Sequence, residues 1–114
     1  RGVVLRNATV SGNGNGTGRN LGTTGATQTV QAVYRVLSGT FTSFWLDIQE
    51  SQNDGGADPY ASIGSTALML EVTTAGVQRI TYTGATEAWK RVQVSSWNGT
   101  SALILVTFGV VQGT

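Results

Sequence analysis

The feature that most constrains the fold is an alternation of apolar and polar side chains with a period of two residues. Segments 28–37 and 41–49 both show it, with apolar positions at Val30, Ala32, Tyr34, Val36, Phe44, Leu46 and Ile48. This alternation is typical of a β-strand with one buried face. No segment shows a convincing 3.6-residue period, so the sequence predicts strands throughout.

Similar short segments recur roughly every ten residues, which predicts about eight strands and an all-β fold, an antiparallel β-sandwich of jelly-roll-like form. The 16 Gly and the single Pro suit a chain with many tight turns. Hairpins are expected at 38–40 and at 74–76. A third is expected at Asn98-Gly99, because this dipeptide between two alternating segments is a strong hairpin signal.

A chain of 114 residues has room for one domain. Segment 11–18 consists almost entirely of Gly, Asn, Ser and Thr, so it has little to bury. We therefore expect residues 1–18 to form a flexible N-terminal arm that orders only against a partner, followed by a single β-sandwich domain at 19–114. The apolar stretch near the C-terminus is too short to span a bilayer as a helix, so no membrane partner is expected.

The chain contains no His and no Cys. This excludes Cys-His and Ser-His catalytic pairs, and zinc or haem sites that depend on those ligands. The glycines of 12–18 do not complete a dinucleotide-binding motif, and the only lysine, Lys90, does not follow a glycine. We predict no catalytic residue, no cofactor and no enzymatic activity.

Four of the six acidic residues, Asp47, Glu50, Asp54 and Asp58, fall within a short stretch of the sequence. Carboxylates grouped in a loop suit a hard cation such as calcium, although their spacing is not that of an EF-hand. Asn53-Asp54-Gly55 and Asp58-Pro59 are also ordinary turn formers, whose side chains bond to the backbone. The four acids are therefore weak metal candidates beside the turn interpretation.

Charged residues make up 11% of the chain and the net charge is +1, which argues against a nucleic-acid partner. The alternation places all three tryptophans, Trp45, Trp89 and Trp97, opposite the aliphatic face of their strands. Outward rings can cap the ends of a sandwich, pack in a subunit contact or stack on sugar rings. The sequence leaves these three alternatives open.

Three runs occur in a recognisable order: Ile-Gln-Glu-Ser-Gln-Asn-Asp-Gly-Gly at 48–56, Thr-Ala-Gly-Val-Gln-Arg-Ile at 74–80 and Trp-Lys-Arg-Val-Gln-Val at 89–94. In this order, over roughly residues 30–112, the chain resembles the small head decoration, or auxiliary capsid (cement), proteins of tailed bacteriophages. The resemblance implies a structural protein on the exterior of the virion, with the major capsid protein as partner and self-association as a homotrimer.

The expected interface residues combine the basic N-terminal third with the outward aromatic side chains and their neighbours. They are Arg1, Val3, Leu5, Arg6, Arg19, Trp45, Tyr60, Trp89, Arg91 and Trp97. The alternative function is that of a carbohydrate-binding β-sandwich module, in a tail or fibre or for adhesion to a host surface, which would use the surface tryptophans.

Overall fold

The computed structural model describes residues 3–111, and these residues form an antiparallel sheet of eight strands. The strands are β1 (Val3–Val10), β2 (Gly14–Asn15), β3 (Arg19–Asn20), β4 (Thr29–Ser51), β5 (Ala61–Ser62), β6 (Leu70–Val72), β7 (Gly76–Thr83) and β8 (Trp89–Val110). The predicted all-β fold class is therefore confirmed. Within the same range no helix is long and apolar enough to cross a membrane.

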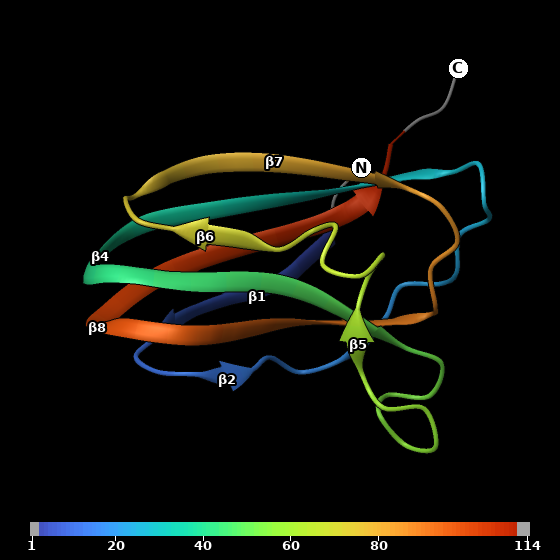
Figure 1. Ribbon diagram of the computed structural model, residues 1–114, viewed down its shortest axis with the longest axis horizontal. Coiled ribbons are helices and arrows are strands. Elements are labelled where there is room, and N and C mark those ends of the chain that lie inside the picture. Colours follow the sequence, from blue (N-terminus) through green and yellow to red (C-terminus); the bar gives the residue numbers. More distant parts are fainter. Residues whose placement is uncertain (1–2, 112–114) are drawn as a thin grey trace.

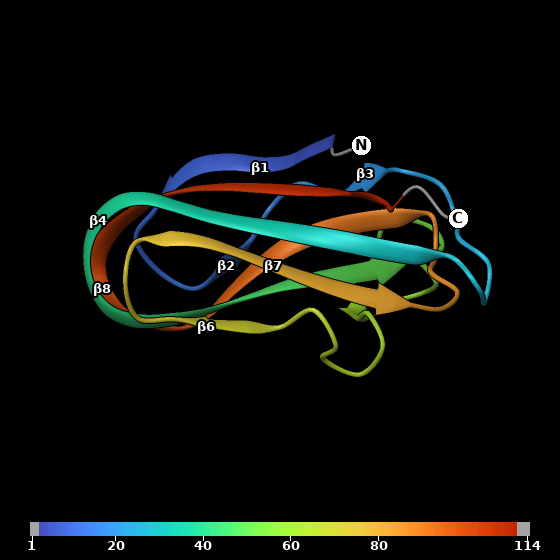
Figure 2. The same cartoon turned by 90° about the horizontal axis from the view of Figure 1, so that it is seen from above.

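The two long strands β4 and β8 form one antiparallel ribbon that folds over on itself. Their pairing runs from Val30↔Val110 at one end to Ser51↔Trp89 at the other, through a bend near Phe41↔Gly99. Figure 2 shows both strands curving round together at the left end of the molecule. The two halves of this ribbon are the centres of the two layers of the sandwich.

Each layer gains edge strands from the rest of the chain. Layer A consists of β7, residues 29–36 of β4, residues 101–110 of β8, and β1. Layer B consists of β5 and β6, residues 41–51 of β4, residues 89–98 of β8, and β2 and β3. Figure 1 shows this arrangement, with β1, β4, β7 and β8 following the length of the molecule.

The expected hairpins at 38–40 and at Asn98-Gly99 are wrong. The chain continues through both points as a strand, because β4 and β8 pair with each other and not with themselves. The glycines serve the bend instead: a Cβ on Gly99 would lie 2.5 Å from Cβ of Phe41, and one on Gly39 would lie 2.5 Å from the carbonyl oxygen of Ser101. Both positions require glycine because two backbones pass too closely for a side chain.

The expected hairpin at 74–76 is also wrong. β6 pairs with residues 44–46 of β4 in layer B, whereas β7 pairs with residues 29–36 of β4 in layer A. The short connection therefore crosses from one layer to the other. The apolar residues that alternate with polar ones on both sides of the connection, Leu70 and Val72 before it and Ile80 and Tyr82 after it, nevertheless all pack against the core.

The core lies between the layers and contains the apolar positions that the alternation predicted. Its fully buried members include Val30, Ala32, Tyr34, Phe44, Leu46, Ile48, Val92, Val94, Ile104 and Val106. Burial of a side chain of this size contributes about 1.5–3 kcal/mol. The side chain of Tyr34 extends through the core, and its hydroxyl donates a 2.5 Å hydrogen bond to the carbonyl oxygen of Leu68.

We expected a flexible arm at 1–18, and this expectation is wrong for residues 3–18, which the structure describes. β1 pairs with β8 along its whole length, and Leu5 and Val10 are each only 5% exposed. The segment that follows is hydrogen-bonded along β8: the backbone N–H of Gly16 donates to the carbonyl of Val92 at 2.7 Å, and that of Trp97 donates to the side chain of Asn13 at 2.9 Å. Exposed backbone groups of β8 provide partners that the glycine-rich composition does not reveal.

Candidate binding surfaces

The outward orientation predicted for Trp97 is wrong. The register between β4 and β8 shifts between Ser43 and Trp45, opposite Ser96, whose φ is +50°. The extra residue is a β-bulge, and a bulge turns the following side chain to the other face. Trp97 therefore packs against the core, with its ring 4.9 Å from that of Phe44 and its indole N–H donating to the carbonyl of Gly99 at 3.0 Å.

Trp45 and Trp89 do lie on the outer face of layer B, as the alternation predicted. Trp45 pairs with Ser95 and Glu71, and Trp89 pairs with Ser51 at the other end of the layer. Both side chains are half-buried. Six residues of extended chain separate them, or about 20 Å at the rise of a strand. The two rings therefore mark the ends of one polar strip and do not form a single platform.

An aromatic and polar network occupies the strip between the two tryptophans. The guanidinium of Arg91 stacks 4.2 Å from the ring of Tyr60, and its Nε donates to Oε1 of Gln49 at 2.8 Å. The hydroxyl of Tyr60 donates to Asp54 at 2.7 Å. Burial and then the Asp54 carboxylate raise the pKa of Tyr60 to about 12. Tyr60 and Arg91 therefore hold loop 51–60 against layer B. These contacts occupy part of the hydrogen-bonding groups and ring surface of the two side chains, so both are only partly available to a partner.

The four acids proposed as metal candidates are not brought together. Within residues 3–111 no three carboxylates form a group that could hold a metal ion. Asp58 accepts from the backbone N–H of Gln52 at 2.8 Å, and Glu50 accepts from that of Glu87 at 2.8 Å. The turn interpretation accounts for the Asp58 bond within the loop, whereas the Glu50 bond joins two segments that are distant in the sequence.

Asp47 is the exception, because it is fully buried under β5. Ser62 donates a hydrogen bond to its Oδ2, whereas its Oδ1 has no partner. Burial raises the pKa of Asp47, and the Ser62 hydrogen bond opposes that rise. The sequence did not predict this burial, since Asp47 occupies an outward position of β4 that only the later segment covers.

Lys90 closes one end of the sandwich. Its side chain is fully buried, and Nζ donates to the carbonyl of Gly22 at 2.7 Å, to Oγ1 of Thr86 at 3.0 Å and to the carbonyl of Glu87. Burial lowers the pKa of Lys90 to about 8. All three N–H donors of the ammonium are engaged, so the residue acts as a structural clamp.

The outer face of layer A carries a group of apolar side chains that the sequence patterns did not single out, beside polar residues such as Thr107, Gln31 and Thr81. Val33 and Leu105 are half-buried on this face, and Leu37 is 54% exposed. Its further members are Val4, Val77 and Leu103, with the basic Arg35 and Arg79. No acidic residue occurs in the strand segments that form this layer. A signal was present in the sequence, because odd positions 33, 103 and 105 are apolar where alternation calls for polar residues.

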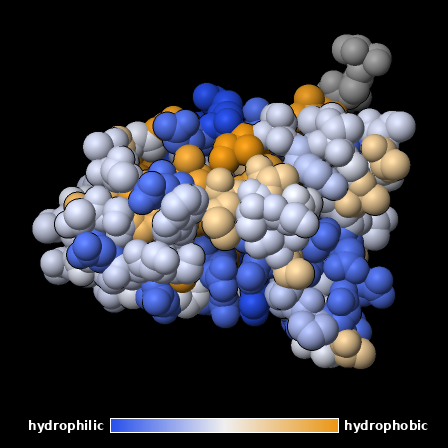
Figure 3. Space-filling model, in the orientation of Figure 1, coloured by the Kyte–Doolittle hydropathy of each residue, from blue (hydrophilic) through white to orange (hydrophobic). Residues whose placement is uncertain are grey.

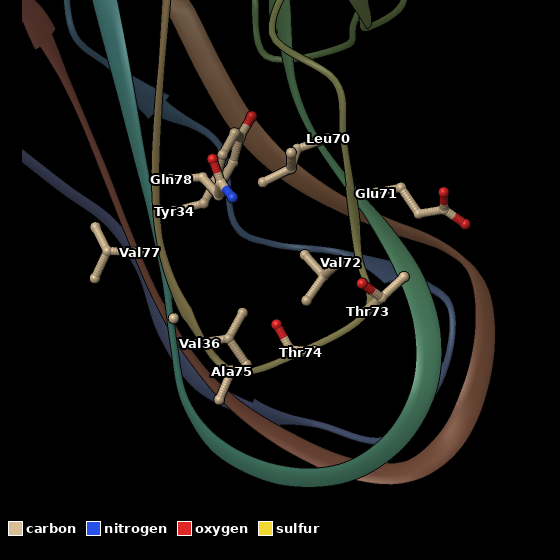
Figure 4. Close-up of a pocket in the computed structure, with 11 residues that line it drawn as sticks. Tyr34, Val36, Leu70, Glu71, Val72, Thr73, Thr74, Ala75, Val77 and Gln78 are labelled. Atoms are coloured by element: carbon tan, nitrogen blue, oxygen red, sulfur yellow. The ribbon is translucent and has the colours of Figure 1, made fainter.

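A pocket opens at the seam between the layers, where β6 and β7 run. We call it the seam pocket. Its volume is about 140 Å³, and it is lined by Tyr34, Val36, residues 70–75 of β6 and the crossing connection, and residues 76–78 of β7. Figure 3 shows apolar side chains gathered near the middle of the visible face in this region. In Figure 4 Leu70 and Val72 point into the space between the strands, whereas Glu71 and Val77 point away.

The candidates of the N-terminal third have different environments. Arg1 lies outside the described residues. Val3 is 40% exposed, but Leu5 belongs to the core and is not available to a partner, because a bulge between Val4 and Arg6 turns it inward. Arg6 faces the core side at the edge, where its Nη1 is buried without a partner, and burial lowers its pKa. The exposed Arg19 donates to the carbonyl of Val4 at 2.6 Å.

Comparison with known proteins supports the fold. No family model matches the chain, and no curated protein matches it. Among solved structures, a family 16 carbohydrate-binding module aligns with a TM-score of 0.51 and 12% identity, over 93% of this chain and 76% of that one. At this identity the match shows a shared β-sandwich architecture.

Two further solved structures align less well. PirA gives a TM-score of 0.46 at 13% identity, over 93% of this chain and 92% of that one. A chain of the acid-stable capsid of Helicobacter pylori bacteriophage KHP30 gives a TM-score of 0.24 at 9% identity, over 96% of this chain and 99% of that one.

Proposed function

We propose that the protein is a non-enzymatic structural protein of a virion that binds the outer surface of the capsid through the outer face of layer A. The observation that carries the proposal is the group of apolar side chains on this face. Val4 and Val77 are 46% and 44% exposed and lie there with Val33 and Leu105. Leu37 is 54% exposed and lies at the register shift that ends the face. Apolar side chains gathered on one face of a soluble β-sandwich are typical of a protein interface.

The resemblance in the order of motifs supports the choice of partner, namely the major capsid protein, with a trimer as the bound form. Arg35 and Arg79 on this face favour a partner surface that carries some carboxylates. With only two charges the attraction is modest, so binding should depend mainly on burial of apolar area and weakly on salt.

The test is occupancy on capsids that lack the protein. Leu37→Asp and Leu105→Asp each place a charge on or beside the face. Val110→Asp is the matched control, since Val110 is 42% exposed and pairs with the buried Val30 on the opposite side of the sheet. Among variants that melt like the wild type, Leu37→Asp and Leu105→Asp should lose at least about tenfold in capsid occupancy, and Val110→Asp should not. Full decoration by all three variants would exclude this face, and absence of the protein from purified virions would exclude the function.

A second candidate, carbohydrate binding, is favoured by Trp45 and Trp89 on the outer face of layer B. Gln93 and Arg91 lie between them and offer hydrogen-bond donors to an extended glycan. The fold is that of a known carbohydrate-binding module, which is compatible with this function. Binding on a glycan array that disappears in both Trp45→Ala and Trp89→Ala would support it, and an array without binding would exclude it.

A further inference from the structure

Strand β7 has a free edge in layer A. It pairs with residues 29–36 of β4 in an unbroken register, and within the described part of the chain it pairs with no second strand. Its burial pattern shows six exposed residues out of eight. In an antiparallel pair every second residue directs its N–H and C=O away from the partner. β7 therefore presents a row of open backbone donors and acceptors.

The other edge strands of the described sandwich have features that hinder pairing with a further strand. β1 carries a bulge between Val4 and Arg6, turns the charge of Arg6 to the core side and has the Val4 carbonyl occupied by Arg19. The remaining edge strands β2, β3, β5 and β6 have only two or three residues each. Bulges, inward charges and short strands are the devices that prevent unwanted strand pairing. β7 has no bulge, no proline and no lysine.

The seam pocket lies beside this edge. Gly76, Val77 and Gln78 contribute to its wall, and Leu70 and Val72 of layer B form the opposite wall. A strand added to β7 would continue layer A, and every second side chain would then point toward the seam between the layers. A volume of about 140 Å³ has room for a benzene-sized group, and Val36, Leu70 and Val72 offer apolar contacts within a lining that also holds Thr73, Thr74 and Gln78. One aliphatic side chain of the added strand fits this space.

On the side of the added strand that faces away from the seam, the charge of β7 favours particular side chains. Arg79 is exposed on the outer face, and layer A holds no carboxylate to neutralise it or Arg35. A cross-strand acidic residue is therefore favoured next to Arg79, and a basic one is disfavoured. Antiparallel pairing of β7 with a second copy of itself would bring two Arg79 side chains near each other. A different chain is the better occupant.

We infer that β7 binds an extended segment of a partner protein by strand addition, with an aliphatic side chain in the seam pocket and an acidic side chain beside Arg79. Main-chain hydrogen bonds supply affinity in this mode of recognition, and pockets for alternate side chains supply specificity. The site is the hydrogen-bonding edge of β7. It shares Arg79 with the outer face of layer A, but it is argued from the open edge and the seam pocket and is tested without capsids, so it does not depend on the capsid proposal.

The test uses the purified full chain and a synthetic library of ten-residue peptides. Every second position holds Val, Ile, Leu or Thr, and the others hold Glu, Ser or Lys. The library is selected on the wild type and on Gln78→Lys, which places a charge at the mouth of the seam pocket. Thr9→Lys on β1 is the matched control, because Thr9 is also exposed on a long edge strand. Thermal melting establishes that both variants are folded.

Peptides should be enriched about tenfold or more on the wild type and on Thr9→Lys relative to Gln78→Lys. Glu should exceed Lys in the selected peptides, and Arg79→Ala should remove that preference. In hydrogen exchange, a selected peptide should slow alternate amides of β7. Absence of enrichment, equal enrichment on Gln78→Lys, or slowing confined to β1 would overturn the inference. Concentration-dependent protection of β7 in the free protein would assign the edge to a second copy instead.

Discussion

Replacement of Gly99 by alanine tests the bent ribbon on which the two-layer architecture depends. A Cβ at this position would lie 2.5 Å from Cβ and 2.6 Å from Cα of Phe41 on the opposite strand. Ordinary carbon contacts begin near 3.5 Å, so the two backbones must separate by roughly 1 Å at the bend. The obstacle is a main-chain atom and cannot be relieved by a change of rotamer.

Overpacking of this kind costs about 1–3 kcal/mol. For a domain of this size each kcal/mol corresponds to a change of about 4 °C in Tm, so Gly99→Ala should lower the Tm by about 4–12 °C. Gly14→Ala is the matched control, because a Cβ on Gly14 would have no atom within 4 Å and this glycine, like Gly99, lies in a strand.

Thermal melting followed by circular dichroism measures both variants. The control should melt at or slightly above the wild-type temperature, since alanine reduces the entropy of the unfolded chain. If Gly99→Ala melts within about 2 °C of Gly14→Ala, roughly 0.5 kcal/mol, the close approach at the bend does not exist and the reasoning fails. A hairpin at Asn98-Gly99 would then be the better interpretation.

Three further outcomes follow from the packing. Trp97→Ala should cost about 2–4 kcal/mol in denaturant unfolding because its ring packs on the core, whereas Trp89→Ala should stay within about 1 kcal/mol; equal losses would contradict the bulge. Leu5→Ala should cost about 2–4 kcal/mol and Val3→Ala under about 1 kcal/mol, and a neutral Leu5→Ala would restore the flexible arm. Burial raises the folded-state pKa of Asp47, so its contribution to stability is present below its unfolded pKa and is lost as pH rises through the folded value. The Tm of Asp47→Asn relative to wild type should therefore be more favourable at about pH 7 than at about pH 3, on either side of the ordinary carboxyl pKa, and no such difference would argue against the burial of this carboxylate.

Much of the core could be predicted from local sequence, because the period of a strand is two residues and burial follows it. Val30, Tyr34, Leu46 and Ile48 are buried as their alternation indicated. The outward positions of Trp45 and Trp89 follow from the same rule. The absence of His and Cys likewise limits the possible chemistry without any knowledge of the fold.

The candidate surfaces depended on information that local patterns do not contain. A bulge adds one residue and reverses the faces beyond it, so the orientation of Trp97 was decided at Ser96. The outer face of layer A is assembled from strands that are far apart in the sequence. The register of β1, β4, β7 and β8 was needed to bring Val4, Val33 and Leu105 together.

The sequence by itself determined most of the residues that face the core and that the chain forms strands, because side-chain periodicity is a local property. Only the tertiary structure decided which strands pair. Two alternating segments around a glycine are equally compatible with a hairpin and with one strand that bends, and the choice depends on whether a distant strand supplies the hydrogen bonds. Here β8 supplies them to β4, so Gly39 and Gly99 became the bend of a ribbon whose two halves enclose the core.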